Sequence, residues 1–314
     1  MGVHNCSTPA FPLIGLARIF YVASCTAIVI VSVALQTIFA MTCNKMKGWK
    51  SNFAFYLLQL MAIFSFLSYM GLLVSYVHGL LLFNSPILSR VTGSNFEGSF
   101  FAFVIAILCL TLHRLFYTLL PLKAQFVLTT TVEKICICSI ILFYIVYVAI
   151  TLSPLASVEF CAALFSFHAG RAPLQEVISL MDQVFCYAAG IVNVTAYTIM
   201  FTTLFIRGSL TFERNREVQM TIQTALASAF ELTFFVCWEI LPSVIPDNWR
   251  RTVNGYILLI YYDILLLPYM ILNQTVKTEM KKLFCKKHYT TSPVLSFYQT
   301  QKTPRQRNSI WKTY

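Results

Sequence analysis

Three acidic residues lie inside long apolar stretches of the sequence, where an ionised carboxylate is costly. Glu231 and Asp263 fall near the middle of their stretches, and Glu239 falls nearer one end. No Lys or Arg stands at a matching depth to balance them. Ionisable groups in such positions commonly belong to ligand, ion or proton sites. The alternative is a structural acid that is protonated and hydrogen-bonds to Asn193 or to a serine.

The stretches that hold these residues are too long and too apolar for a water-soluble domain. Apolar residues make up 58% of the chain and charged residues only 11%, whereas a soluble domain has about 25% charged residues. Between Lys50 and Arg90 there are 39 residues without a single Asp, Glu, Lys or Arg, and about 20 apolar residues suffice to cross a bilayer as a helix. The composition therefore predicts an integral membrane protein.

We expect an all-α membrane protein that folds as a seven-transmembrane helical bundle. The seven predicted crossings are Phe20–Met41, Phe53–Val77, Phe100–Leu120, Ile135–Leu152, Gln183–Ile206, Thr224–Val244 and Tyr256–Leu272. Backbone groups in hydrocarbon must be satisfied within the membrane-spanning structure, which leaves helices or closed barrels. Barrel strands would show alternation over about ten residues, and the sequence does not.

The distribution of Lys and Arg predicts the orientation of the chain. Eighteen of them fall on one side of the predicted bundle and five on the other, and the richer side is expected to be cytosolic. The amino terminus is then outside and the carboxyl terminus cytosolic, in a multi-pass membrane protein. Asn5, in the triplet Asn5-Cys6-Ser7, is a glycosylation acceptor on the outer side.

A short amphipathic helix is expected after the last crossing. In residues 275–287, Val276, Met280, Leu283 and Phe284 share one face and lysines occupy the other, which favours a helix lying in the inner interface. Cys285 is a candidate for palmitoylation, with an unmodified thiol as the alternative. Residues 1–287 then form the transmembrane domain, and residues 288–314 a flexible cytosolic tail.

Three segments resemble elements of rhodopsin-like G-protein-coupled receptors. The segment His113-Arg114-Leu115-Phe116-Tyr117-Thr118-Leu119-Leu120-Pro121 is similar to the Asp-Arg-Tyr segment at the inner end of the third helix. Phe234, Cys237 and Trp238 match a Phe-x-x-Cys-Trp element, followed by Pro242, and Leu267-Pro268-Tyr269-Met270-Ile271-Leu272-Asn273 is similar to the inner motif of the seventh helix. The chain looks most like the nematode serpentine chemoreceptors of the x, xa, v or t classes.

This resemblance implies a receptor that binds an external small molecule, such as an odorant, and signals through a cytosolic heterotrimeric G protein. It implies G-protein coupling through the segment from His113 and Arg114 to Pro121, and plasma-membrane or sensory-cilium localisation. It also implies an activation switch, whose residues are Phe234, Trp238, Pro242, Pro268 and Asn273. The alternatives are a topogenic role for Arg114 and simple packing for Trp238.

The resemblance also suggests where a ligand would bind. The candidates are the three intramembrane acids, Glu231, Glu239 and Asp263, together with His78, Asp182 and Arg18 at the outer helix ends. Phe, Tyr and Met residues would line the pocket. The usual disulfide from the outer end of the third helix cannot form, because no Cys lies between Cys43 and Cys109. A bridge between Cys6 and Cys161 is one possible replacement.

Other classes of function are disfavoured. The basic residues lie between apolar stretches, so the net charge of +11 does not indicate nucleic-acid binding. The ten cysteines have no zinc-site spacing, and no metal or cofactor is expected. No hydrolase or metalloprotease motif indicates an enzyme. A transporter or proton-coupled carrier that uses Glu231 and Asp263 as relay groups remains the alternative function.

Overall fold

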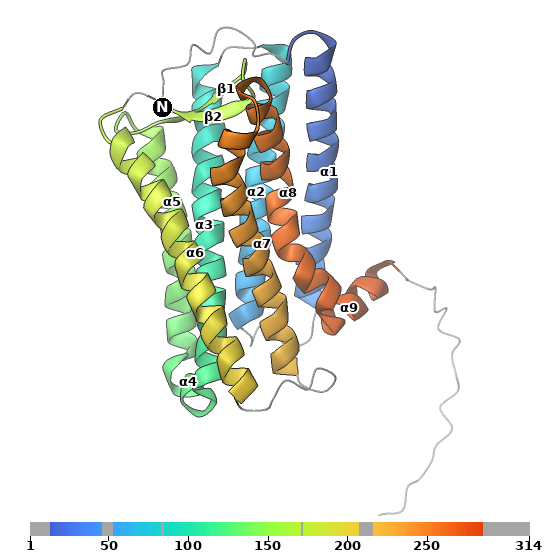
Figure 1. The fold of residues 1–314 in the computed structure, drawn as a ribbon, viewed down its shortest axis with the longest axis vertical. Helices are drawn as coiled ribbons and strands as arrows, with labels where there is room; N and C mark the ends of the chain where they lie inside the picture. The colour runs from blue at the N-terminus through green and yellow to red at the C-terminus, as the bar shows by residue number, and fades with distance from the viewer. Residues whose placement is uncertain (1–12, 46–52, 83–84, 171, 207–215, 285–314) are drawn as a thin grey trace, which may run out of the picture.

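The computed structural model describes residues 13–45, 53–82, 85–170, 172–206 and 216–284. Its long helices run side by side in one bundle (Figure 1). They are α1 (Leu16–Lys45), α2 (Phe53–Leu81), α3 (Pro86–Leu119), α5 (Thr130–Leu152), α6 (Gln175–Ile206), α7 (Arg216–Val244) and α8 (Asp247–Leu272). The shorter elements are α4 (Pro121–Val127), α9 (Gln274–Phe284), β1 (Val158–Cys161) and β2 (Ser166–Ala169).

Six of the described helices are long and apolar enough to cross a membrane: α1, α2, α3, α5, α6 and α8. The bundle therefore has the character of a multi-pass membrane protein, as the composition predicts. Helix α7 coincides with the sixth predicted crossing, and among the side chains that the structure describes it contains the apolar stretch Ala225–Trp238. The sixth predicted crossing is thus a helix in the structure, and its passage through a membrane stays a prediction.

Helix α3 begins fourteen residues before the predicted crossing, at Pro86 rather than Phe100. Ser85 caps it, since the Ser85 hydroxyl accepts a hydrogen bond from the Leu88 amide (3.4 Å), and Pro86 suits the first helical position. The polar residues of this first part are mostly buried against neighbouring elements rather than exposed as a loop. Glu97 consequently lies inside the helix and not in a connection.

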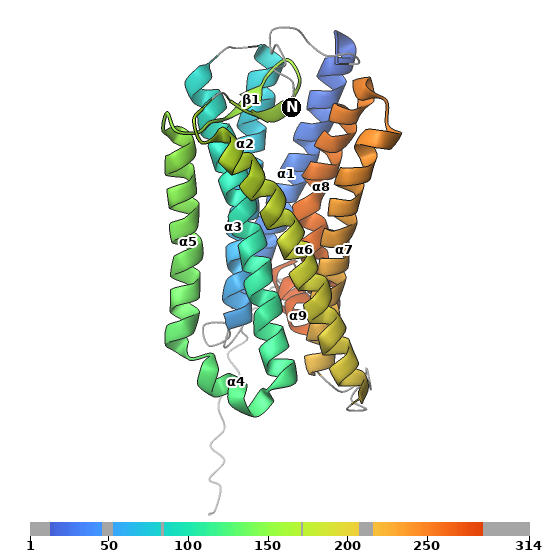
Figure 2. The ribbon, with the colours of Figure 1, turned by 60° about the vertical axis from the view of Figure 1, so that its left-hand side comes forward.

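Strands β1 and β2 form an antiparallel hairpin that the sequence analysis did not predict. Val158 pairs with Ala169, and Cys161 pairs with Ser166. The hairpin lies over one end of the bundle, and α4 lies at the opposite end (Figure 2). We call these the hairpin end and the α4 end.

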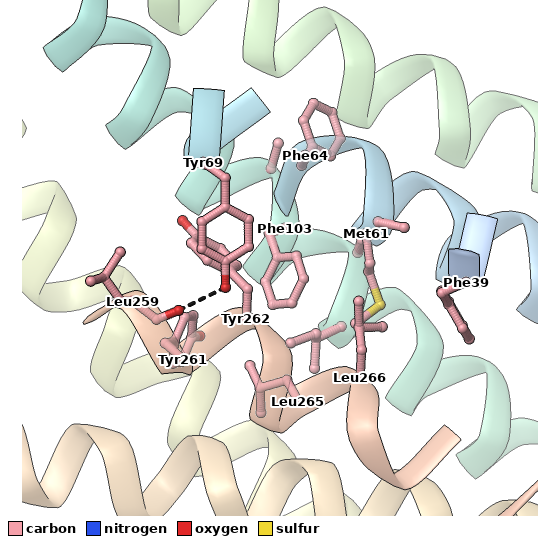
Figure 3. Close-up of a cluster of buried hydrophobic side chains, with 14 of the residues drawn as sticks. Phe39, Met61, Phe64, Tyr69, Phe103, Leu259, Tyr261, Tyr262, Leu265 and Leu266 are labelled. Carbon is pink, nitrogen blue, oxygen red and sulfur yellow. Dashed lines mark hydrogen bonds between the residues drawn. The ribbon is translucent and has the colours of Figure 1, made fainter. Parts of the chain in front are cut away.

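The core is concentrated between α2, α3 and α8. Aromatic side chains from all three helices meet there, with Tyr69 and Tyr262 at 5.6 Å between ring centres and Phe103 and Tyr262 at 5.0 Å (Figure 3). The Tyr69 hydroxyl donates to the Leu259 carbonyl at 2.7 Å. More than half of α2 is buried, whereas only Ile140, Tyr147 and Thr151 are buried in α5. The protein is thus packed much more densely on one side than on the other.

The predicted amphipathic helix after the last long helix is confirmed as α9. Val276 is fully buried, and Met280 packs against the core. The Asn273 side chain caps this helix, because its Oδ1 accepts from the amides of Thr275 (3.0 Å) and Val276 (3.2 Å). Asn273 therefore fixes the corner between α8 and α9.

Removing this cap is expected to weaken the corner. Asn273→Ala should lower the free energy of unfolding by about 1 kcal/mol, because two helix amides lose their acceptor, while Asn273→Asp should retain most of the stability. The measurement is thermal unfolding of the purified protein in detergent, with the exposed Gln274→Ala as control. Equal melting temperatures for Asn273→Ala and Asn273→Asp would show that the cap contributes nothing.

Candidate functional site

A buried carboxylate joins α6 to α7. Glu231 is only 1% exposed, and its Oε2 accepts a hydrogen bond from Nδ2 of Asn193 at 2.6 Å. This is the Asn193 contact that the sequence analysis considered for a structural acid. The second oxygen of Glu231, Oε1, has no hydrogen-bond partner among the described residues, and neither has Oδ1 of Asn193. One oxygen of each side chain in this pair therefore lacks a hydrogen-bond partner among the described residues.

Two further carboxylates gather near Glu231, around the thiol of Cys186. On α6, the Cys186 Sγ donates to Asp182 Oδ1 at 3.6 Å. The spacing of Asp182, Cys186 and Asn193 places them on one face of the helix. Glu97 on α3 and Glu231 on α7 both lie close enough to Cys186 to act on it electrostatically. Three helices thus direct acidic groups to one region.

Tyr261 on α8 completes this region. It is 2% exposed, its hydroxyl has no hydrogen-bond partner among the described residues, and it lies within electrostatic range of both Glu231 and Cys186. Aromatic rings surround it, with ring centres at 4.2 Å for Phe234 and 5.7 Å for Phe100. We call Glu97, Asp182, Cys186, Glu231 and Tyr261 the carboxylate cluster.

The other intramembrane acid that the structure describes lies in a different environment. Asp263 accepts hydrogen bonds from the Ser32 hydroxyl (2.5 Å) and from Nε2 of Gln36 (2.8 Å), so that each of its oxygens has a partner on α1. This arrangement is the structural acid with a serine partner that the sequence left open. Asp263 therefore links α1 to α8 and does not join the carboxylate cluster.

No protein-family model matches the chain. No curated protein matches it significantly either.

The residues expected to contact a G protein lie at the α4 end. His113 is buried against Phe53, with 5.3 Å between ring centres, and also packs on Tyr117. Arg114 is partly exposed, five residues before α3 ends at Leu119. The chain turns at Leu120, and α4 begins at Pro121. His113 thus packs between helices, whereas Arg114 has partial access to the surface.

The proposed switch residues occupy dissimilar positions. Phe234 packs against Tyr261, whereas Trp238 stacks on Phe234 and remains 41% exposed. Pro242 stands two residues before the end of α7, so any bend that it causes falls in the last two turns of that helix. Pro268 lies inside α8, and Asn273 caps α9 as described above.

Arg18, expected at an outer rim, instead fastens the hairpin to the bundle. Its guanidinium donates to the carbonyls of Ala162 (2.7 Å), Ala163 (3.4 Å) and Gly79, and it lies 4.3 Å from the centre of the Phe165 ring. The side chain is 6% exposed. Arg18 therefore binds backbone carbonyls of α2 and of the hairpin rather than facing an entering ligand.

His78 also has a structural position. It is 5% exposed, and its Nε2 accepts a hydrogen bond from the Ser85 amide at 3.3 Å, which closes the connection between α2 and α3.

In the hairpin, burial lowers the pKa of His168, although Glu159 on the opposite strand acts against this shift. His168 is therefore neutral at pH 7.

Helix α3 is held to the hairpin by polar contacts where a disulfide cannot form. The Ser89 hydroxyl donates to the Phe160 carbonyl and accepts from the Phe160 amide, both at 2.8 Å. Arg90 donates to the carbonyls of Ser153 (2.5 Å) and Ala156 (3.0 Å). A Cβ atom at Gly93 would collide with the Val158 carbonyl, so β1 approaches the α3 backbone closely.

Several predicted positions lie outside the described residues. They are Asn5, Cys6 and Cys285, and the side chains of Pro121, Glu239 and Pro242. Cys161, the proposed partner of Cys6, is 1% exposed within β1.

Two apolar grooves lie on the outer surface of the bundle rather than at the carboxylate cluster. The larger, about 400 Å³, is lined by α1 and α2, including Val22, Ala23 and Val77. The other, about 310 Å³, includes His78 and Leu88. Neither contains an acidic residue, so the polar site and these grooves are separate features.

The sequence analysis missed Glu97 and Asn95. Asn95 donates to the Leu67 carbonyl (2.7 Å) and accepts from the Tyr144 hydroxyl (2.8 Å), which ties α3 to α2 and α5. Both residues lie in the polar segment assigned to a connection. The signal that could have found them is the Ser85-Pro86 pair, which is typical of a helix start and comes before both residues in the sequence.

Proposed function

We propose that the chain is a seven-helix receptor that binds a small extracellular molecule at the carboxylate cluster and signals to a cytosolic heterotrimeric G protein. The observation that carries this proposal is the course of α3. It contributes Glu97 to the cluster and Arg114 to the surface at the α4 end, 17 residues and roughly 25 Å apart along the helix. One rigid element thus connects the two sites.

The proposed orientation follows the positive-inside rule. The α4 end carries the excess of Lys and Arg and would face the cytosol, and the hairpin end would face outward. Helix α7 would add the sixth crossing in chain order to the six apolar helices and so complete seven. Glu231 lies inside its apolar stretch, with Oε2 2.6 Å from Nδ2 of Asn193. The resemblance to nematode serpentine chemoreceptors supports a sensory role at the plasma membrane, including sensory cilia.

Signalling requires two arrangements of the bundle and a ligand that prefers one of them. We expect helices α6 and α7 to move relative to each other. In the Glu231–Asn193 pair between them, one oxygen of each side chain has no hydrogen-bond partner among the described residues. A ligand that completes this pair would change the relative stability of the two arrangements. The movement would then alter the surface around Arg114.

The test is nucleotide exchange on a G protein. Cells expressing the chain with a promiscuous G protein and a calcium reporter are first screened with chemicals to find an activator. Arg114→Ala should then lower activator-dependent exchange by at least about tenfold, equivalent to the loss of roughly 1.4 kcal/mol of coupling. Lys123→Ala, which removes an exposed positive charge on α4 at the same end, should leave exchange unchanged.

The rival carrier function gives the opposite result. If no compound promotes exchange, and solute flux into vesicles depends on Glu231 or Asp263, the receptor proposal is wrong. If Lys123→Ala and Arg114→Ala reduce exchange equally, the effect of Arg114 is one of general positive charge and not of a specific contact.

A further inference from the structure

We propose that the carboxylate cluster binds a small organic cation, an amine or a quaternary ammonium. This inference rests on the proposed function for the role of the site, and it names the chemical class of the ligand.

The first argument is charge. Glu97, Asp182 and Glu231 approach one another around Cys186 from three helices. None of the three forms an ion pair with a described Lys or Arg. Burying several acids without a counter-charge is unfavourable. A cationic ligand would supply the counter-charge that the chain itself does not provide here.

The second argument is the pair of unsatisfied polar atoms. Glu231 Oε1 and the Tyr261 hydroxyl have no hydrogen-bond partner in the described part of the chain, although their side chains are 1% and 2% exposed. Buried polar groups are nearly always hydrogen-bonded, so each such exception points to a missing partner. A protonated amine would donate to Glu231 Oε1 in a charge-assisted hydrogen bond, and a quaternary ammonium, which has no N–H, would interact with it through its charge alone.

The third argument is the aromatic surroundings. Phe234 and Trp238 follow Glu231 at spacings of three and seven residues, which places all three on one face of α7. Phe234 packs on Tyr261 at 4.2 Å between ring centres, and Phe100 and Phe103 reach Tyr261 from α3. Aromatic faces beside carboxylates attract organic cations.

A bare metal ion fits less well than an organic cation. No group of three or more His, Cys, Asp or Glu side chains among the described residues is arranged to ligate a metal. The aromatic rings also offer no metal ligands. The combination of one carboxylate oxygen without a hydrogen-bond partner among the described residues, a tyrosine hydroxyl and several ring faces instead suits a cation with an apolar body.

Asp263 provides a matched internal control. It is also a carboxylate at depth in the bundle, but Ser32 and Gln36 already occupy both of its oxygens. Removing its charge should not affect binding of a cation at the carboxylate cluster. The comparison of Glu231→Gln with Asp263→Asn therefore separates a ligand contact from a general electrostatic effect.

The experiment measures binding to the purified full chain in lipid nanodiscs, without a G protein. Two cationic probes, choline and phenethylamine, are compared with their neutral counterparts, 3,3-dimethylbutan-1-ol and 2-phenylethanol. At millimolar concentration, at least one cation should raise the melting temperature by about 3 °C or more, and its neutral counterpart should not. Glu231→Gln should weaken this binding at least about tenfold, and Asp263→Asn should not change it.

If Glu231→Gln does not fold, Glu97→Gln, with an expected loss of about fivefold or more, replaces it. Stabilisation by neither cation, equal stabilisation by the neutral compounds, or equal loss in Asp263→Asn would overturn the proposal. Because no G protein is present, the two proposals fail separately. Activation by neutral compounds without cation binding refutes the ligand class alone, and cation binding without nucleotide exchange refutes the receptor function alone.

Discussion

Gly93→Ala is expected to destabilise the protein by about 3 kcal/mol, while the same added methyl group at Gly190 should leave its stability unchanged or slightly raise it. At Gly93 the new Cβ would meet the backbone of Val158 in β1, and backbone atoms cannot move aside as a flexible side chain can. At Gly190, within α6, nothing lies within 4 Å of the added atom, and alanine favours the helix.

The measurement is thermal unfolding of both variants in the same detergent, together with limited proteolysis of the hairpin. Gly93→Ala should melt several degrees lower, and its hairpin should be cleaved faster. Similar melting temperatures for the two variants would mean that β1 does not lie against α3 as closely as the structure places it.

Arg18→Ala should produce the other large effect, a loss of about 3 kcal/mol or more. The guanidinium donates to three carbonyls on two elements and contacts the Phe165 ring, so its removal leaves several buried acceptors without a donor. Arg18→Lys should recover only part of the stability, because an ammonium cannot reach all three carbonyls and stack on the ring at once.

Arg251→Ala is the matched control for Arg18, since this residue is a partly exposed arginine on α8, near the same end of the bundle. Its melting temperature should stay close to that of the parent protein. If Arg18→Lys is as stable as the parent, the charge alone holds the hairpin, and the network of carbonyl contacts is unimportant.

The long helices could be predicted from the sequence because hydrocarbon imposes a simple length and polarity rule. The structure has a helix at each predicted crossing, and α2 begins at Phe53 as expected. The rule fails where polar residues are buried by neighbouring protein. Helix α3 extends through Ser89 and Asn95, whose hydrogen-bond partners lie on β1, α2 and α5 and are invisible in the local sequence.

The candidate site could be predicted only in part, for the same reason. Burial of Glu231 and its contact with Asn193 follow from their positions in apolar stretches. The proximity of Asp182, Glu97 and Tyr261 depends on how α3, α6 and α8 pack, which periodicity does not specify. Arg18 resembled an ordinary charge at a helix end because the hairpin carbonyls that it binds are about 145 residues away in the chain.

The uneven packing of the bundle determines which half can deform. Helices α2 and α3 bury 56% of their apolar spans, whereas α1 buries 33%, α6 28% and α5 17%. Local opening is consequently expected on the side of α5 and α6 rather than between α2 and α3. Helices α2 and α3 thus form the rigid part of the bundle and α6 belongs to the deformable part. The acids of the carboxylate cluster lie on both parts.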